Sequence, residues 1–321
     1  MSVMPAEASG TRSKYDRLIA AAQKVPPVLT LVVHPCDESS LRGAVDAAEA
    51  GIIKPILVGP AAKIRDIAAK HGMNISSYEI VDTPHSEAAA AKAVEMIHQG
   101  KGEALMKGSL HTDELMRSVT AKSGGLRTSR RISHVFIMDV PAYADTVFVT
   151  DAAINIFPDL DAKRDIIQNA IDLYNEAGFG TTPRVAILSA VETVTSAIPS
   201  TIEAAALCKM ADRGQITGAV LDGPLAFDNA IDVEAARIKG IKSEVAGRAQ
   251  ILVVPDLESG NMLAKNLAYF AKADGAGIVL GARVPIVLTS RADSARARMA
   301  SAAFAVLFAN AQRRGAPIAA A

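Results

Sequence analysis

The chain has 321 residues, half of them hydrophobic, and its 34 lysines and arginines balance its 34 aspartates and glutamates. This length suffices for two domains, each with its own hydrophobic core. The balanced charge and the absence of tryptophan argue against a nucleic-acid partner, which normally requires a basic surface. The two cysteines, Cys36 and Cys208, are far apart in the sequence and provide neither a metal motif nor a disulfide framework.

Neither end of the chain predicts a membrane association. The first 17 residues are polar and lack the apolar core of a signal peptide. Near the C-terminus, the uncharged segment Met299–Gln312 is too short to span a bilayer. The sequence therefore predicts a cytoplasmic protein without a membrane partner, which fits its sparse use of cysteine.

Short runs rich in valine and isoleucine recur along the chain and are typical of strands buried on both faces. They cover Val28–Val33, Pro55–Val58, Tyr78–Val81, Glu103–Met106, His134–Val140, Thr146–Thr150, Arg184–Ser189, Thr217–Asp222, Gln250–Pro255, Gly277–Leu280 and Pro285–Thr289. Alanine-rich helical segments alternate with them, at Ser39–Ala50, Ala61–His71, Ser86–His98, Thr112–Ala121, Asp161–Ala177, Thr201–Ala211, Ser259–Ala273 and Asp293–Asn310. This alternation predicts an α/β fold with mainly parallel sheets and helices on both faces.

A domain boundary is predicted after Phe157, where a strand-like run ends and a helix with acidic residues in its first turn begins. The alanine-rich C-terminal helix needs a neighbouring element to cover it, so we expect it to fold back on the first domain. The sequence therefore predicts a first domain of residues 1–157 and 279–321, and an inserted second domain of residues 158–278.

Candidate site residues follow the predicted strands, because ligands of open parallel sheets bind beyond the carboxyl ends of the strands. Ser290, Arg291 and Asp293 stand between the last strand and the last helix. A helix N-terminus with an arginine beside it suits a phosphate group. A helix cap is the alternative role for the serine or the aspartate.

Two further strand ends carry candidate substrate-binding residues. Lys107 and Ser109 precede a helix that contains Arg117, and these basic residues suit an anion, although Lys107 could instead be an exposed strand end. Gly260 and Asn261 lie at the start of another helix, where the glycine would allow a ligand to approach the backbone. An ordinary capped helix start is the alternative there.

Several common sites are missing from the sequence. It has no G-x-x-x-x-G-K-[ST] motif for nucleotide phosphates, and the spacing of Gly275, Gly277 and Gly281 departs from the dinucleotide fingerprint. The histidines are scattered without metal-ligand spacing, so we expect no metal. Among them, only His34 follows a predicted strand at the edge where ligands bind. The basic cluster of Arg127, Arg130 and Arg131 is more typical of a solvated surface.

Five segments carry a family resemblance: MKGSLHTDELMRSV at 106–119, DAAINIFPDLDAKRDIIQNAI at 151–171, DGPLAFDNAI at 222–231, PDLES with GNMLAKNLAYFAKADGAG at 255–277, and LTSRADSA at 288–295. They resemble the phosphate acetyltransferase and phosphate butyryltransferase family in order and spacing, from about Val28 onward. DGPLAFDNAI and TSRADS are closer to the butyryl branch.

The resemblance implies a two-domain fold like that of isocitrate and isopropylmalate dehydrogenases, with the active site in the interdomain cleft, and a homodimer. It implies reversible transfer of a short acyl group, acetyl or butyryl, between coenzyme A and inorganic phosphate, with coenzyme A as a substrate and without metal or NAD. The family's serine–arginine pair falls on Ser290 and Arg291, and an arginine of the helix after the glycine-rich strand end falls on Arg117. The acetyl branch has an aspartate at the position of Ala297 and a coenzyme A-linked arginine at the position of Tyr269.

Roles for these residues follow from the chemistry of acyl transfer. We expect Ser290 to donate a hydrogen bond to the carbonyl oxygen as it gains charge. Arg291 and Arg117 would bind phosphate, and Asp293 would take the proton of the thiol. Alternative functions are an NAD-dependent dehydrogenase of the same fold, an inactive paralogue that acts as a binding protein, which Ala297 favours, and acyl transfer from an acyl carrier protein.

Overall fold

The computed structural model describes residues 14–289 and 293–315. Its centre is one sheet with the strand order β3-β2-β1-β4-β11-β10-β5-β6-β9-β7-β8. The strands are β1 (Val28–Val33), β2 (Ile53–Gly59), β3 (Glu79–Asp82), β4 (Ala104–Lys107), β5 (Ser133–Asp139), β6 (Val147–Thr150), β7 (Arg184–Leu188), β8 (Val220–Leu225), β9 (Ile251–Val253), β10 (Asp274–Leu280) and β11 (Ile286–Val287). Of the strand pairs within the described ranges, seven are parallel and three antiparallel. The predicted α/β fold with mainly parallel strands is confirmed.

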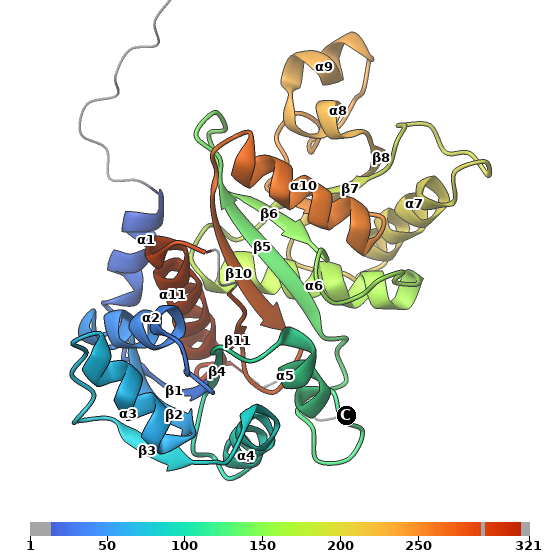
Figure 1. The fold of residues 1–321 in the computed structure, drawn as a ribbon. Helices are drawn as coiled ribbons and strands as arrows, with labels where there is room; N and C mark the ends of the chain where they lie inside the picture. Colours follow the sequence, from blue (N-terminus) through green and yellow to red (C-terminus); the bar gives the residue numbers. More distant parts are fainter. Residues whose placement is uncertain (1–13, 290–292, 316–321) are drawn as a thin grey trace, which may run out of the picture.

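Helices cover both faces of this sheet (Figure 1). They are α1 (Lys14–Ala22), α2 (Glu38–Glu49), α3 (Ala61–Lys70), α4 (Ser86–His98), α5 (Thr112–Val119), α6 (Leu160–Glu176), α7 (Pro199–Asp212), α8 (Phe227–Ile231), α9 (Val233–Ile238), α10 (Leu257–Tyr269) and α11 (Ala295–Gln312). The alternation along β5 is clear: Val135 and Ile137 join the hydrophobic cluster that contains α6 and α11, whereas Phe136 and Met138 join the cluster beneath α10. This two-sided burial explains why β5 is almost continuously apolar.

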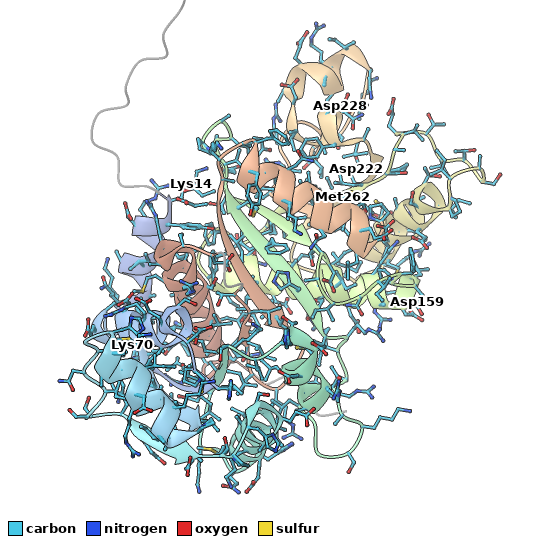
Figure 2. The ribbon with its side chains drawn as sticks, viewed as in Figure 1. Lys14, Lys70, Asp159, Asp222, Asp228 and Met262 are labelled. Atoms are coloured by element: carbon cyan, nitrogen blue, oxygen red, sulfur yellow. The ribbon has the colours of Figure 1, made fainter. Side chains whose placement is uncertain are left out.

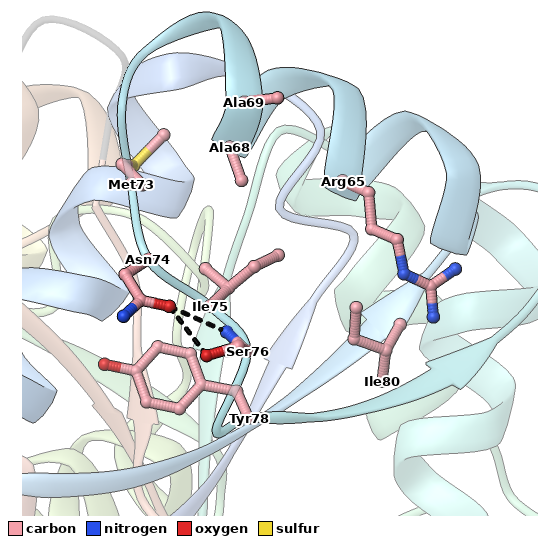
Figure 3. Close-up of a pocket in the computed structure, with 9 residues that line it drawn as sticks. All are labelled: Arg65, Ala68, Ala69, Met73, Asn74, Ile75, Ser76, Tyr78 and Ile80. Atoms are coloured by element: carbon pink, nitrogen blue, oxygen red, sulfur yellow. Dashed lines mark hydrogen bonds between the residues drawn. The ribbon is translucent and has the colours of Figure 1, made fainter.

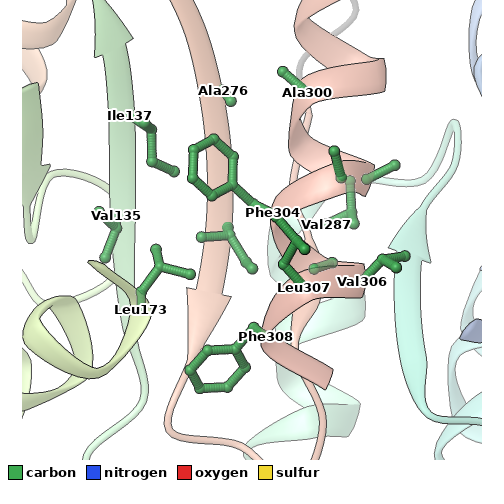
Figure 4. Packing of buried hydrophobic residues seen from close by; sticks show 14 of the residues in the cluster. Val135, Ile137, Leu173, Ala276, Val287, Ala300, Phe304, Val306, Leu307 and Phe308 are labelled. Atoms are coloured by element: carbon green, nitrogen blue, oxygen red, sulfur yellow. The ribbon is translucent and has the colours of Figure 1, made fainter. Parts of the chain in front are cut away.

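The C-terminal helix α11 lies in the middle of the molecule, against β10, α1, α2 and α6. Figure 4 shows Ala300, Phe304 and Leu307 of α11 packed towards β5 and β10. The ring of Phe304 stacks on Phe179 at 5.6 Å between ring centroids. Alanine is the commonest residue of α11, and the covered position of the helix agrees with the expectation from its composition.

The helix α1 was not expected from the sequence, and neither were the short helices α8 and α9. Tyr15 of α1 is buried, and its hydroxyl donates hydrogen bonds to the carbonyl oxygens of Ile137 and Asp274. Lys14, which is labelled in Figure 2, forms an ion pair with Asp139 at 3.0 Å. Polar contacts of this kind attach α1 to the end of β5, although the helix itself is short.

The predicted boundary at residues 157 and 158 falls between β6 and α6, and the side chain of Asp159 caps α6 by accepting the backbone N–H of Ala162. One sheet nevertheless continues through both predicted domains, since β10 pairs with β5 and with β11. The division into two domains stays a prediction. Within the described residues, no helix is both long and apolar enough to cross a membrane.

Candidate active site

Strand order brings three predicted site segments to one edge of the sheet. The parallel strands β1, β4 and β11 are neighbours, and Val33 of β1 pairs with Lys107 of β4. Their carboxyl ends therefore lead side by side into His34, into Gly108 and into the segment after Leu288. Ser290 and Arg291, the two central candidates, lie outside the described residues. Asp293 lies just before α11, within them.

We call His34, Cys36, Lys107, Gly108 and Ser109 the β1–β4 junction. The backbone N–H of Gly108 donates to the carbonyl oxygen of Val33 at 2.8 Å, and that of Ser109 donates to the carbonyl oxygen of His34 at 2.9 Å. A Cβ atom on Gly108 would lie 2.3 Å from the oxygen of Val33, so glycine is required for this close approach.

Side chains of the junction reinforce the backbone contacts. The hydroxyl of Ser109 lies 2.9 Å from the carbonyl oxygen of His34, 3.0 Å from its Nδ1 and 3.2 Å from the backbone nitrogen of Cys36. Lys107 is buried, with 9% of its surface exposed, so the alternative of an exposed strand end is wrong. Burial, and then the positive charge of Lys63, lower the pKa of His34.

Arg117, the third basic candidate, projects from α5 into solvent, with 69% of its side chain exposed. Its guanidinium lies 3.5 Å from a carboxylate oxygen of Glu87 and 3.8 Å from one of Asp113. Exposed ion pairs of this length contribute little stability. Arg117 therefore follows the β1–β4 junction in sequence, but its guanidinium contacts acidic side chains of α4 and α5.

At the start of α11, the residue that caps the helix is not Asp293, the candidate for taking the thiol proton. Ser294 is the N-cap residue, and its hydroxyl accepts the backbone N–H of Ala297 at 3.1 Å. Asp293 thus precedes the cap, and the expectation that it could itself cap the helix is wrong. Ala297 is buried with 6% exposure, so the position where the acetyl branch has an aspartate holds a methyl group.

The start of α10 holds the other predicted pair. Asp256 caps this helix by accepting the backbone N–H of Ser259 at 2.8 Å. A Cβ atom on Gly260 would lie 2.6 Å from Val254 and 2.9 Å from Ala152, and the amide of Asn261 donates to the carbonyl oxygen of Ala152 at 3.3 Å. The close approach that the glycine allows is therefore made by the chain itself.

The basic cluster near residue 130 has structural partners. Arg130 forms an ion pair with Asp172 at 2.9 Å, and Arg131 donates a hydrogen bond to the side chain of Asn155 at 2.7 Å. The first contact holds the chain before β5 against α6, and the second holds it against the segment between β6 and α6. Among the residues that the structure describes, no group of three potential ligands could hold a metal ion.

A shallow cavity of about 480 Å³ lies at the far edge of the sheet, between α3 and β3 (Figure 3). Its lining residues are Arg65, Ala68, Ala69, Met73, Asn74, Ile75, Ser76, Tyr78 and Ile80. Asn74 accepts hydrogen bonds from the backbone and the hydroxyl of Ser76, so these polar groups of the cavity wall bond to each other within one turn. The cavity contains none of the residues that the sequence predicts for a site.

Comparison with known proteins places the chain in a family. The model for the family described as phosphate acetyl/butaryl transferase matches residues 84–306, more than half of the chain. A phosphate acetyltransferase of Rhizobium meliloti is 72% identical over 308 residues, which are 96% of this chain and 97% of that protein. A phosphate butyryltransferase of Clostridium acetobutylicum is 44% identical over 273 residues, 85% of this chain and 90% of that protein.

Solved structures agree with this assignment. A branched-chain phosphotransacylase from Enterococcus faecalis has a TM-score of 0.76 at 28% identity and covers 88% of this chain and 99% of its own. A 4-hydroxythreonine-4-phosphate dehydrogenase from Burkholderia phymatum has a TM-score of 0.51 at 15% identity, covers 93% of this chain and all of its own, and shares the fold alone. The predicted dehydrogenase-like fold is confirmed, and the chain belongs to the phosphate acetyl/butyryl transferase family of acyltransferases.

Proposed function

We propose that this protein transfers an acetyl group reversibly between coenzyme A and inorganic phosphate. The 72% identity over 96% of the chain to a phosphate acetyltransferase carries this proposal. Identity to the butyryl-named relative is lower, at 44%, which supports acetyl over butyryl, although two sequence motifs are closer to the butyryl branch. We further propose that coenzyme A is a substrate, that no metal or NAD takes part, and that the enzyme is a cytoplasmic homodimer.

The reaction takes place, in this proposal, at the edge formed by the ends of β1, β4 and β11. Arg291 binds phosphate with its planar pair of donors, and the buried ammonium of Lys107 adds positive charge at the neighbouring strand end. Ser290 donates a hydrogen bond to the acyl oxygen as it gains charge. Arg117 would reach this site only by leaving its acidic partners on α4 and α5.

Asp293 acts at the sulfur. In the direction of acyl phosphate synthesis, the C–S bond breaks and a carboxyl group returns a proton to the departing thiolate. In the reverse direction, the carboxylate takes that proton from the thiol, which is mostly protonated at neutral pH. Its place in the sequence supports this assignment, because Asp293 follows the serine–arginine pair and directly precedes Ser294, the N-cap residue of α11.

The experiment that tests the proposal measures phosphate-dependent release of free coenzyme A from acetyl-, propionyl-, butyryl- and longer acyl-CoA. We expect turnover that requires phosphate, is highest with acetyl-CoA and persists with EDTA. A parallel reaction with NAD, followed by nicotinamide absorbance, is the control for dehydrogenase activity. If no acyl-CoA releases its thiol, the protein is an inactive binding paralogue and the enzymatic proposal is wrong.

A further inference from the structure

His34, at the edge of the sheet formed by the ends of β1, β4 and β11, has an unusual backbone conformation. Its φ of 53° is left-handed, a conformation that residues other than glycine rarely adopt. The residue is held on both sides: its N–H donates to Val58 at 2.7 Å, and its carbonyl oxygen accepts the N–H groups of Cys36 at 2.8 Å and Ser109 at 2.9 Å. Strained residues that the surrounding structure fixes in this way cluster at functional sites.

The imidazole ring is oriented by the same serine. The hydroxyl of Ser109 donates to the carbonyl oxygen of His34 at 2.9 Å, which uses its one hydrogen. Nδ1 of His34, 3.0 Å from this hydroxyl oxygen, then carries the ring hydrogen and donates to it. This arrangement leaves the lone pair on Nε2, which makes no hydrogen bond to any described side chain.

The surroundings of the ring keep it neutral near pH 7. Burial and the ammonium of Lys63 on α3 lower the pKa of His34 below its ordinary value of 6.5. Asp37 before α2 and Glu114 on α5 raise the pKa of His34, and His85 before α4 lowers it, each by less than burial does. A neutral imidazole with a defined tautomer at the ligand-binding edge of a sheet is suited to accept a proton.

The reaction requires a proton transfer at phosphate as well as at sulfur. An acyl phosphate dianion that loses its acyl group without a proton would release a phosphate trianion, which is a far stronger base than the dianion and a poor leaving group. In the opposite direction, the P–OH of attacking phosphate becomes much more acidic once a neighbouring oxygen is acylated. A group near phosphate that takes this proton in one direction and returns it in the other would therefore lower the barrier in both directions.

We propose that Nε2 of His34 exchanges this proton with phosphate, and that Ser109 is the positioning residue that orients the ring. As phosphate attacks the acyl carbon, a C–O bond forms and the C–S bond breaks with its electron pair on sulfur. Nε2 takes the P–OH proton, and the departing sulfur is protonated by Asp293. In reverse, imidazolium returns the proton as phosphate leaves. This inference rests on the proposed function.

The test is a pair of variants assayed for phosphate-dependent thiol release. His34→Asn keeps an amide near the position of Nδ1 but removes Nε2, and we expect kcat to fall roughly a hundredfold with little change in KM for acetyl-CoA. The wild type needs neutral His34, so its rate should fall as the pH drops below 6.5, through the lowered pKa of His34. That acid limb should disappear in His34→Asn. Ser109→Ala should retain the limb but move its midpoint.

His98→Asn is the matched control, because His98 is an exposed histidine on α4 that bonds to the carbonyl oxygens of Gly124 and Gly125. It should keep both kcat and the acid limb. Nitrogen-15 NMR of the histidine rings tests the tautomer, and the signals of His34 are assigned as those that are missing in His34→Asn. They should show a neutral ring with its hydrogen on Nδ1.

Two results would overturn the role of His34 but leave the proposed function intact. One is a folded His34→Asn variant with wild-type kcat and acid limb, and the other is a neutral His34 ring with its hydrogen on Nε2. Absence of turnover in the wild type would instead overturn the proposed function, and this inference with it.

Discussion

The β1–β4 junction and the start of α10 have the same local plan, a strand end, a glycine and a helix, and the sequence predicts substrate contacts at both. In each, the glycine is required by the chain itself: a Cβ atom would lie 2.3 Å from a backbone oxygen at Gly108 and 2.6 Å from Val254 at Gly260. A glycine at a strand-to-helix turn therefore does not distinguish a ligand site from close packing.

Polar side chains distinguish the two regions. The β1–β4 junction places Lys107, Ser109 and the imidazole of His34 together, partly buried, beside the end of β11. The start of α10 instead meets apolar atoms of Ala152 and Val254, and Met262 of the same helix is exposed (Figure 2). We therefore expect substitutions in the first region to change turnover and substitutions in the second to change stability.

The largest expected effect belongs to Ser290→Ala, at a residue that follows β11 in the sequence. If Ser290 donates to the acyl oxygen only as charge develops, kcat should fall about a hundredfold or more while both KM values stay nearly constant. Steady-state kinetics of phosphate-dependent thiol release measure this. A variant that changes only KM for phosphate would make the serine a phosphate ligand instead.

Apart from His34→Asn, Asp293→Asn should have the next largest effect. Removal of the carboxylate should lower kcat at least tenfold and change its pH dependence, while the helix cap on Ser294 stays in place. Ser294→Ala is the matched control and should lose about 1 kcal/mol of stability while it keeps near-normal turnover. Equal kinetics in the two variants would move the search for the sulfur base to Asp139, Asp222 or a water molecule.

The sequence predicts the sheet better than the site, for a physical reason. Strands such as Val28–Val33 are nearly continuous apolar runs, so local pattern locates them well, whereas α8 and α9, with five and six residues, are too short to show a helical period. The pairing of His34 with Ser109 joins residues 75 positions apart through a left-handed turn. The spacing of residues along the chain predicts neither this pairing nor the left-handed turn. It also does not predict the direction in which Arg117 points.

Gly260→Ala would show whether the start of α10 is packing or a ligand site. The added methyl group would overlap Val254 and Ala152, so the free energy of unfolding should fall by about 1–3 kcal/mol. Once folded, the variant should retain the KM for acetyl-CoA. A stable variant with a tenfold higher KM would mean that substrate, not packing, requires this glycine, and the contrast between the two regions would be lost.

The smallest expected effect is that of Asn261→Ala. Its amide hydrogen bond to Ala152 is long, at 3.3 Å, and the side chain is only partly buried, so the loss of unfolding free energy should be about 1 kcal/mol or less. Because the amide is directed at the protein backbone, kcat and both KM values should remain within about twofold of wild type, as for a position without substrate contact. Urea unfolding and steady-state kinetics on the same preparation separate the two outcomes. A rise in KM for acetyl-CoA with unchanged stability would show that Asn261 binds coenzyme A, and that the polar side chains of α10 belong to the active site together with those of the β1–β4 junction.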